Sequence, residues 1–153
     1  MKRFWNKYRS TMLSYVLVKA MIVLSVLFAL GLPFIVDVYC NTLVAETSQL
    51  IRIPLTISLY IAAALVLIAG IALDRLLSNI KKDIVFDTAN VKYLRYISWC
   101  CFAAAGVFFI LGVFIFLSFV ICVAALFFGL IIRVVKNLFC EAVQIKSEND
   151  LTI

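Results

Sequence analysis

The sequence predicts an all-α integral membrane protein, a four-helix bundle whose C-terminal helix extends into the cytoplasm. Two observations carry this prediction. Of the 153 residues, 66% are hydrophobic and only 14% are charged, whereas an average soluble domain is about half apolar and about a quarter charged. The apolar residues also come in long uncharged blocks, with the cations gathered between them. A soluble domain of this length has too little interior to bury such blocks, so the expected surroundings are a lipid bilayer.

The hydrophobic blocks define a single domain with four spans. About 20 helical residues, at about 1.5 Å each, cross a hydrocarbon core of about 30 Å. The first block is longer than the ~7–15 apolar residues of a signal peptide, which favours an uncleaved first span. The predicted spans are about 11–36, 55–73, 98–116 and 118–138, with a cytoplasmic loop at 74–97 and a cytoplasmic tail at 139–153.

The last two spans come from one block, 97–132, that contains no charged residue. A single helix of that length would measure about 54 Å, which exceeds the hydrocarbon thickness even with a steep tilt. Two spans joined by a tight external turn near Phe116 to Phe119 fit better. Beyond the block, Val135, Leu138 and Phe139 recur at helical spacing, which predicts that the last helix continues into water and ends at about residues 146–149.

The distribution of Lys and Arg predicts the orientation. The leader carries four cations, the first connection one, the second five, the third none and the segment from Arg133 to the end of the chain three. Because short cytoplasmic segments collect Lys and Arg, both termini and the middle loop are expected inside the cell membrane, a bacterial inner membrane. The middle loop leads into the third span, for which Asp87 or Asn90 is the expected N-cap.

Lys19 is the charge that lies inside a predicted span. Two interpretations are open: its ammonium reaches the cytoplasmic interface along its alkyl stem, or it pairs with an acid, a lipid phosphate or a substrate. Asp37 and Arg52 flank the predicted external loop and are expected to pair across it. Cys40 is expected in that loop, accessible from outside.

The sequence offers no catalytic or metal-binding pattern. It contains no histidine, and its five cysteines form no Cys-x-x-Cys pair, so the common zinc, haem and iron–sulfur spacings are absent. No acid lies inside a predicted span, which weakens an ion-coupled transport hypothesis. The net charge of +6 is explained by membrane flanks rather than by direct nucleic-acid binding. No enzyme activity and no cofactor are therefore expected.

The inner face supplies the candidate binding residues, for anionic lipid headgroups or for a cytosolic partner. In the tail, Leu151 and Ile153 are expected to fold back under the helices against Leu77, Ile80 or Phe86, while Glu148 and Asp150 approach the loop cations. The candidate partner- or lipid-binding residues are Lys19, Lys81, Lys82, Phe86, Asn90, Lys92, Arg95, Glu148, Asn149, Asp150, Leu151 and Ile153.

Two short segments resemble a known family. The stretch Phe86…Asn90…Leu94-Arg95-Tyr96-Ile97, followed by two spans, and the ending 148–153 (Glu-Asn-Asp-Leu-Thr-Ile) are similar to bacterial membrane proteins of the DUF2975 family. The resemblance implies four spans, cytoplasmic termini and no assigned enzymatic activity. It also implies a regulatory role, because members are often encoded beside a small helix-turn-helix repressor. The chain departs from that pattern in having almost no connection between its last two spans.

Two hypotheses about function follow. The first is a non-enzymatic membrane regulator or accessory protein that binds a cytosolic partner, such as a small helix-turn-helix regulator, through its inner face. The alternative is a small oligomeric transporter, channel or export-immunity component, which would act as a homo-oligomer. Both place the protein in the lipid bilayer.

Overall fold

Four long α-helices form the computed structural model, which describes residues 2–43, 48–82, 84, 85 and 87–150. The helices are α1 (Lys2–Leu43), α2 (Ser48–Lys81), α3 (Thr88–Gly112) and α4 (Ser118–Asp150). Each is long and apolar enough to cross a membrane. The predicted fold class is therefore confirmed: the chain is an all-α, multi-pass membrane protein with four spanning helices.

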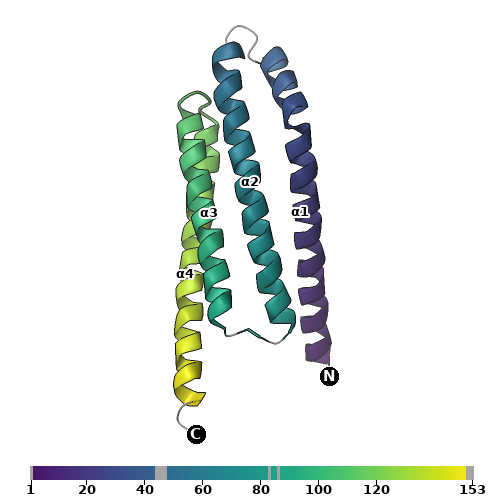
Figure 1. Ribbon diagram of the computed structural model, residues 1–153, viewed down its shortest axis with the longest axis vertical. Helices are drawn as coiled ribbons and strands as arrows, with labels where there is room; N and C mark the ends of the chain where they lie inside the picture. Colours follow the sequence, from purple (N-terminus) through teal and green to yellow (C-terminus); the bar gives the residue numbers. More distant parts are fainter. Residues whose placement is uncertain (1, 44–47, 83, 86, 151–153) are drawn as a thin grey trace.

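The helices pack in chain order, α1 against α2, α2 against α3 and α3 against α4, and in the described part of the chain the backbones of no other pair of helices come close. The start of α1, the α2–α3 connection and the end of α4 lie at the same end of the molecule, which we call the polar end (Figure 1). The opposite end, with the α1–α2 and α3–α4 connections, is the far end. This open row leaves large apolar side chains exposed on the outer helices, for example Leu30 and Phe34 on α1, as suits contact with lipid.

Helices continue through the segment that was predicted to be an external loop. α1 extends to Leu43 and α2 begins at Ser48, so the connection is far shorter than the expected stretch from Asp37 to Pro54. A helix satisfies its own backbone hydrogen bonds, so it can continue beyond the hydrocarbon core of the membrane. A few polar side chains in the sequence therefore do not mark the end of the helix. The predicted loop position of Cys40 is wrong, because Cys40 lies within α1 and is 1% exposed.

A buried cluster joins three helices at the far end. Cys40 packs there with residues of α1, α2 and α3, and partly buried aromatic side chains surround it. In lipid such contacts stabilise through close packing rather than through the hydrophobic effect. The buried members of the cluster are Val36, Cys40, Leu55 and Leu111.

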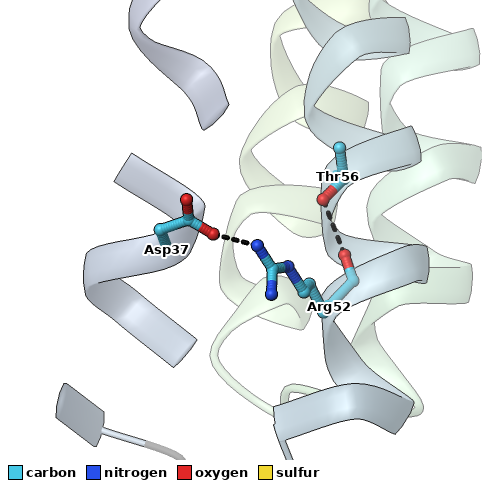
Figure 2. Close-up of polar contacts among 3 residues, drawn as sticks. All are labelled: Asp37, Arg52 and Thr56. Atoms are coloured by element: carbon cyan, nitrogen blue, oxygen red, sulfur yellow. Dashed lines mark hydrogen bonds and ion pairs between the residues drawn. The ribbon is translucent and has the colours of Figure 1, made fainter. Parts of the chain in front are cut away.

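An ion pair connects α1 and α2 near this cluster. The Arg52 guanidinium donates a hydrogen bond to the Asp37 carboxylate, and the Thr56 hydroxyl donates to the Arg52 carbonyl at 2.7 Å (Figure 2). The predicted pairing of Asp37 with Arg52 is confirmed. Both side chains are about half exposed, and such pairs typically contribute only about 0–1 kcal/mol. The pair therefore orients the two helices more than it stabilises them.

α3 and α4 form a tight antiparallel hairpin. The turn occupies residues 113–117 and begins three residues before the predicted position. The Ile115 amide donates to the Leu111 carbonyl at 2.9 Å, and the ring of Phe119 covers Gly112. A Cβ at Gly112 would lie 2.9 Å from that ring, so a side chain here would push the hairpin apart.

Candidate functional site at the polar end

The side chains with candidate roles gather at the polar end, in three groups on different pairs of helices. The first connects α1 and α2, the second holds the α2–α3 connection, and the third lies between α3 and α4. Each group is described below with the predicted residues that belong to it. Phe86, Leu151 and Ile153 lie outside the described residues.

The first group is built around Lys19. Its Nζ lies 3.4 Å from Oδ2 of Asp74, and it also stands over the Tyr15 ring, 5.3 Å from the ring centre. Lys81 approaches the same ring at 5.5 Å. Of the two open interpretations of Lys19, the structure shows the pairing with an acid.

Asp74 was expected in a water-facing stretch, but it lies on α2 facing α1. Its side chain is 23% exposed, and its Oδ1 is buried without a hydrogen-bond partner among the described residues. The carboxylate therefore depends on Lys19 for its charge compensation, since removing one member of a buried pair leaves the other uncompensated. This arrangement arises because α2 continues past Leu73 for two further turns.

The second group centres on Asn90, which is fully buried. Its side-chain nitrogen donates to the carbonyls of Ile84 and Val85, both at 2.8 Å. Its side-chain oxygen accepts a hydrogen bond from the Asn79 amide at 2.8 Å. The Asn90 side chain thus provides hydrogen-bond donors for two backbone carbonyls of the connection and links the connection to α2. The predicted capping role belongs to Asp87, whose carboxylate accepts from the Ala89 amide.

The cations beside this connection remain separate from one another. Lys82 follows α2 and is exposed, and Lys92 is exposed on α3. Neither makes an ion pair with another described residue, since the recorded pairs involve Lys19 and Arg52. Asn90 therefore anchors Ile84 and Val85 of the connection, and the exposed Lys82 and Lys92 lie before and after these anchored residues in the chain.

The third group surrounds a hollow of about 320 Å³ between α3 and α4. Arg95, Ser98 and Trp99 line it from α3, and Arg133 and Lys136 line it from α4. The Ser98 hydroxyl donates to the Gly129 carbonyl at 3.0 Å, which fixes the two helices side by side. Of the predicted candidates, Arg95 alone belongs to this group.

Through Asp150 the tail is helical and continues α4, with an i,i+4 hydrogen bond from Gln144 to Glu148 at 3.2 Å. Within the described residues α4 packs against α3. The expected contacts of Leu151 and Ile153 lie outside the described residues, so the fold-back of the tail stays a prediction. The prediction that the last helix continues past Arg133 to about residues 146–149 is confirmed, because α4 ends at Asp150. Asn149 lies on the last turn of α4.

Several of these residues were not singled out from the sequence as site residues. The partners of Asn90 are backbone carbonyls and Asn79, which no local pattern reveals. The hollow depends on the register of α3 against α4. A signal for it existed, because Arg133 and Lys136 are three apart and Arg95, Ser98 and Trp99 are three and four apart, so each set shares one helix face.

Comparison with known families gives one match. The profile of a family described as protein of unknown function (DUF2975) matches residues 39–153. The matched residues include α2, α3 and α4 entirely, together with every residue of the second and third groups described above. Neither the curated proteins nor the solved structures gave a match.

Proposed function

Because the chain belongs to the DUF2975 family of proteins of unknown function, its role has to be argued from its own geometry, and we propose that it is a regulatory or accessory protein of the cell membrane. It binds a cytosolic protein partner, such as a small helix-turn-helix regulator, through its polar end. The proposal includes no catalytic activity. Sequestration of the partner, or relay of a membrane signal to it, is the proposed mechanism.

The charge distribution supports a cytoplasmic polar end. Twelve of the 14 Lys and Arg residues belong to the leader, the middle connection and the segment from Arg133 to the end of the chain, and one belongs to the far end. These three segments lie together in the fold (Figure 1). Since cytoplasmic flanks of spanning helices are enriched in Lys and Arg, the polar end faces the cytosol in this proposal.

The observation that carries the proposal is the projecting end of α4. The helix has 33 residues, which is about 50 Å at about 1.5 Å per residue, whereas the hydrocarbon core measures about 30 Å. Counting from Ser118 at the far end, the last dozen or so residues extend beyond the core. Leu138 and Ile145 lie on this projection, and they are 60% and 59% exposed.

These two side chains form an apolar stripe, because positions seven apart lie on one face of a helix. We call Leu138 and Ile145 the docking stripe. Lys146 stands beside it, and Cys140 lies on the opposite face and is exposed. A water-facing helix with an apolar stripe fits the helix-in-groove mode of protein recognition, in which such side chains serve as anchors.

The proposal is tested by replacing the stripe. The protein is purified from native membranes in mild detergent, and the co-purified proteins are identified by mass spectrometry. We expect a stoichiometric cytosolic partner with the unaltered chain and its loss with Leu138→Glu combined with Ile145→Glu. The matched control, Cys140→Glu, puts the same charge on the opposite face and should retain the partner. A protein that carries no partner, or a control that loses it equally, would contradict the proposal.

A second function, a small oligomeric transporter or channel, is favoured by one feature. The open row leaves the outer faces of α1 and α4 uncovered within the described structure, and such faces suit contacts between copies. The mass of the protein in lipid nanodiscs distinguishes the two. A single closed oligomer that supports ion or solute flux would favour this alternative, whereas a monomer with a bound cytosolic protein would favour regulation.

A further inference from the structure

The hollow between α3 and α4 brings three cations together without a carboxylate. Arg95 comes from one wall, and Arg133 and Lys136 come from the other. None of the three forms an ion pair within the described residues, where the recorded pairs are Lys19–Asp74 and Asp37–Arg52. Like charges around one small volume repel each other, so this arrangement is favourable when an anion occupies the hollow.

Four of the five side chains that line the hollow are donors only. Arginine and lysine side chains donate hydrogen bonds and accept none, and the indole of Trp99 has a donor only. The fifth, Ser98, donates its hydroxyl hydrogen bond to the Gly129 carbonyl, so its oxygen can only accept. A ligand that fits must therefore present acceptor oxygens with negative charge. Phosphate matches, because the arginine fork binds its oxygens two at a time and lysine adds a point charge.

The depth of the hollow indicates where this phosphate comes from. Arg133 and Lys136 lie 15 and 18 residues after Ser118, which is about 22 and 27 Å along the helix. Since the hydrocarbon core is about 30 Å thick, the hollow lies near its boundary with the headgroups. Trp99 is 60% exposed beside it, as is common for indole rings at the membrane interface.

Around Arg133, α4 exposes apolar side chains to lipid. Leu130 and Val134, which lie three residues before and one residue after Arg133, are both more than half exposed. Acyl chains lying along this surface would hold a headgroup at the level of the three cations. A free phosphate would gain nothing from these side chains. The volume of the hollow, about 320 Å³, falls at the small end of ligand pockets, which suits a headgroup rather than a whole lipid.

We propose that this hollow is a binding site for the phosphate headgroup of an anionic phospholipid, with Arg95, Arg133 and Lys136 as its ligands. Basic recesses between membrane helices at the cytoplasmic side are a known way of holding headgroups with two phosphates. The charge of three cations is matched more closely by a headgroup with two phosphates than by a headgroup with one phosphodiester. Cardiolipin is therefore expected to bind more tightly than phosphatidylglycerol, and phosphatidylcholine least. The site is independent of the docking stripe.

The test uses the full chain in nanodiscs of phosphatidylcholine, with cardiolipin added in increasing amounts and bound lipid counted by native mass spectrometry. The unaltered protein should hold one cardiolipin in preference to the neutral lipid. The variant with Arg133→Gln and Lys136→Gln should bind it at least roughly tenfold more weakly, since each cation near a membrane surface contributes about a factor of five. Arg95→Gln removes one cation from the other wall and should weaken cardiolipin binding by roughly a factor of five.

The control removes two cations of the leader through Lys7→Gln and Arg9→Gln, because in the described part of the chain α1 packs against α2 and not against the two helices that form the hollow. It should bind cardiolipin within about a factor of two of the unaltered protein. An equal loss in this control would show that general surface charge attracts the lipid, and the proposed site would be overturned. The charge-keeping variants Arg95→Lys and Arg133→Lys should retain cardiolipin, which separates loss of charge from loss of folding.

Two further arms distinguish the source of the phosphate. Inorganic phosphate and glycerol phosphate are added at millimolar concentration to protein that holds cardiolipin. We expect neither to displace the lipid. Displacement by either compound at concentrations comparable to the lipid would identify a site for a soluble anion and overturn the lipid assignment.

Discussion

The amide of Asn79 donates a hydrogen bond at 2.8 Å to the side-chain oxygen of Asn90, eleven residues further along the chain. Through this contact α2 and α3 are joined at the point where the chain reverses. Asn90 also holds two carbonyls of the connection itself, so its fully buried amide is completely used. One side chain therefore anchors the described part of this connection, Ile84 and Val85, at the polar end.

The first prediction concerns this pair. Asn90→Ala removes three hydrogen bonds and leaves two carbonyls without partners, which should cost about 2–4 kcal/mol of stability, since an unsatisfied buried group costs about 1–3 kcal/mol. Asn79→Ala removes one bond and should cost about 1 kcal/mol. The measurement is unfolding in mixed detergent micelles, followed by circular dichroism. Equal losses in the two variants would show that Asn90 does not organise the connection.

The sequence predicts those features of the fold that depend on local composition, and it does not predict those that depend on contacts between distant residues. Four spans, the turn between the last two and the helical extension of α4 depend on local composition and periodicity, so they were predicted. The end of α1 and the start of α2 were not predicted, because a helix satisfies its own backbone hydrogen bonds and can continue past the polar residues that mark the edge of the membrane. Cys40 is buried in a cluster that also contains Leu111, 71 residues away, and no local pattern shows that these helices meet there.

The candidate site follows the same division. Arg95 and Asn90 could be selected for their residue types and positions, but their roles depend on partners from other helices. In the α3–α4 hairpin, equal distances from the turn at Ile115 place Ser98 opposite Ile132, one turn from its observed partner Gly129. Once the position of the turn is known, the sequence therefore predicts that Arg95 and Arg133 lie at about the same level of the hairpin. The pairing of Lys19 with Asp74 was not, because it requires the register of α1 against α2.

The second prediction concerns Lys19 and Asp74. Lys19→Leu leaves the carboxylate of Asp74 without its counter-charge, and one of its oxygens is already buried without a partner. We expect lower yield and a lower melting temperature in detergent. The double variant with Lys19→Leu and Asp74→Leu should recover most of the loss, because it removes the uncompensated charge. A double variant as unstable as Lys19→Leu would show that the two residues act independently.

The third prediction tests the orientation. In a background without native cysteines, single cysteines at Ser10, Lys82 and Ser147 should be shielded from an impermeant thiol reagent in intact cells and react after lysis. A cysteine at Phe116, which is 82% exposed in the far-end turn, should react without lysis. In a separate variant that keeps Cys40 as its single cysteine, this thiol should remain unreactive in both conditions, since it is buried.

Labelling at Lys82 in intact cells would reverse the proposed orientation. Labelling at Ser147 alone would indicate that α4 does not return to the cytoplasmic side. The reactivity of Phe116→Cys after lysis serves as the control for folding, because the substituted side chain is exposed whichever way the protein is inserted.

The last prediction compares two glycines of the α3–α4 hairpin. At Gly106 on α3 an added Cβ would meet nothing within 4 Å, so Gly106→Ala should stabilise the helix by about 0.5–1 kcal/mol through its reduced conformational freedom. At Gly129 on α4 the Cβ would lie 3.2 Å from the Cβ of Cys101 and from the ring of Phe102. The Cys101 Cβ is attached directly to the backbone, so relief requires the helices to separate.

Separation would also lengthen the bond from Ser98 to the Gly129 carbonyl, which holds the two walls of the basic hollow together. Gly129→Ala should therefore be less stable than Gly106→Ala by about 1–2 kcal/mol, within the cost of overpacking a closely packed contact. The same variant should also bind cardiolipin more weakly, whereas Gly106→Ala should bind it normally. Both variants are compared by unfolding in mixed micelles and by lipid counting in nanodiscs. If Gly129→Ala gained as much stability as Gly106→Ala, the close approach of α3 and α4 at this level would not exist as described.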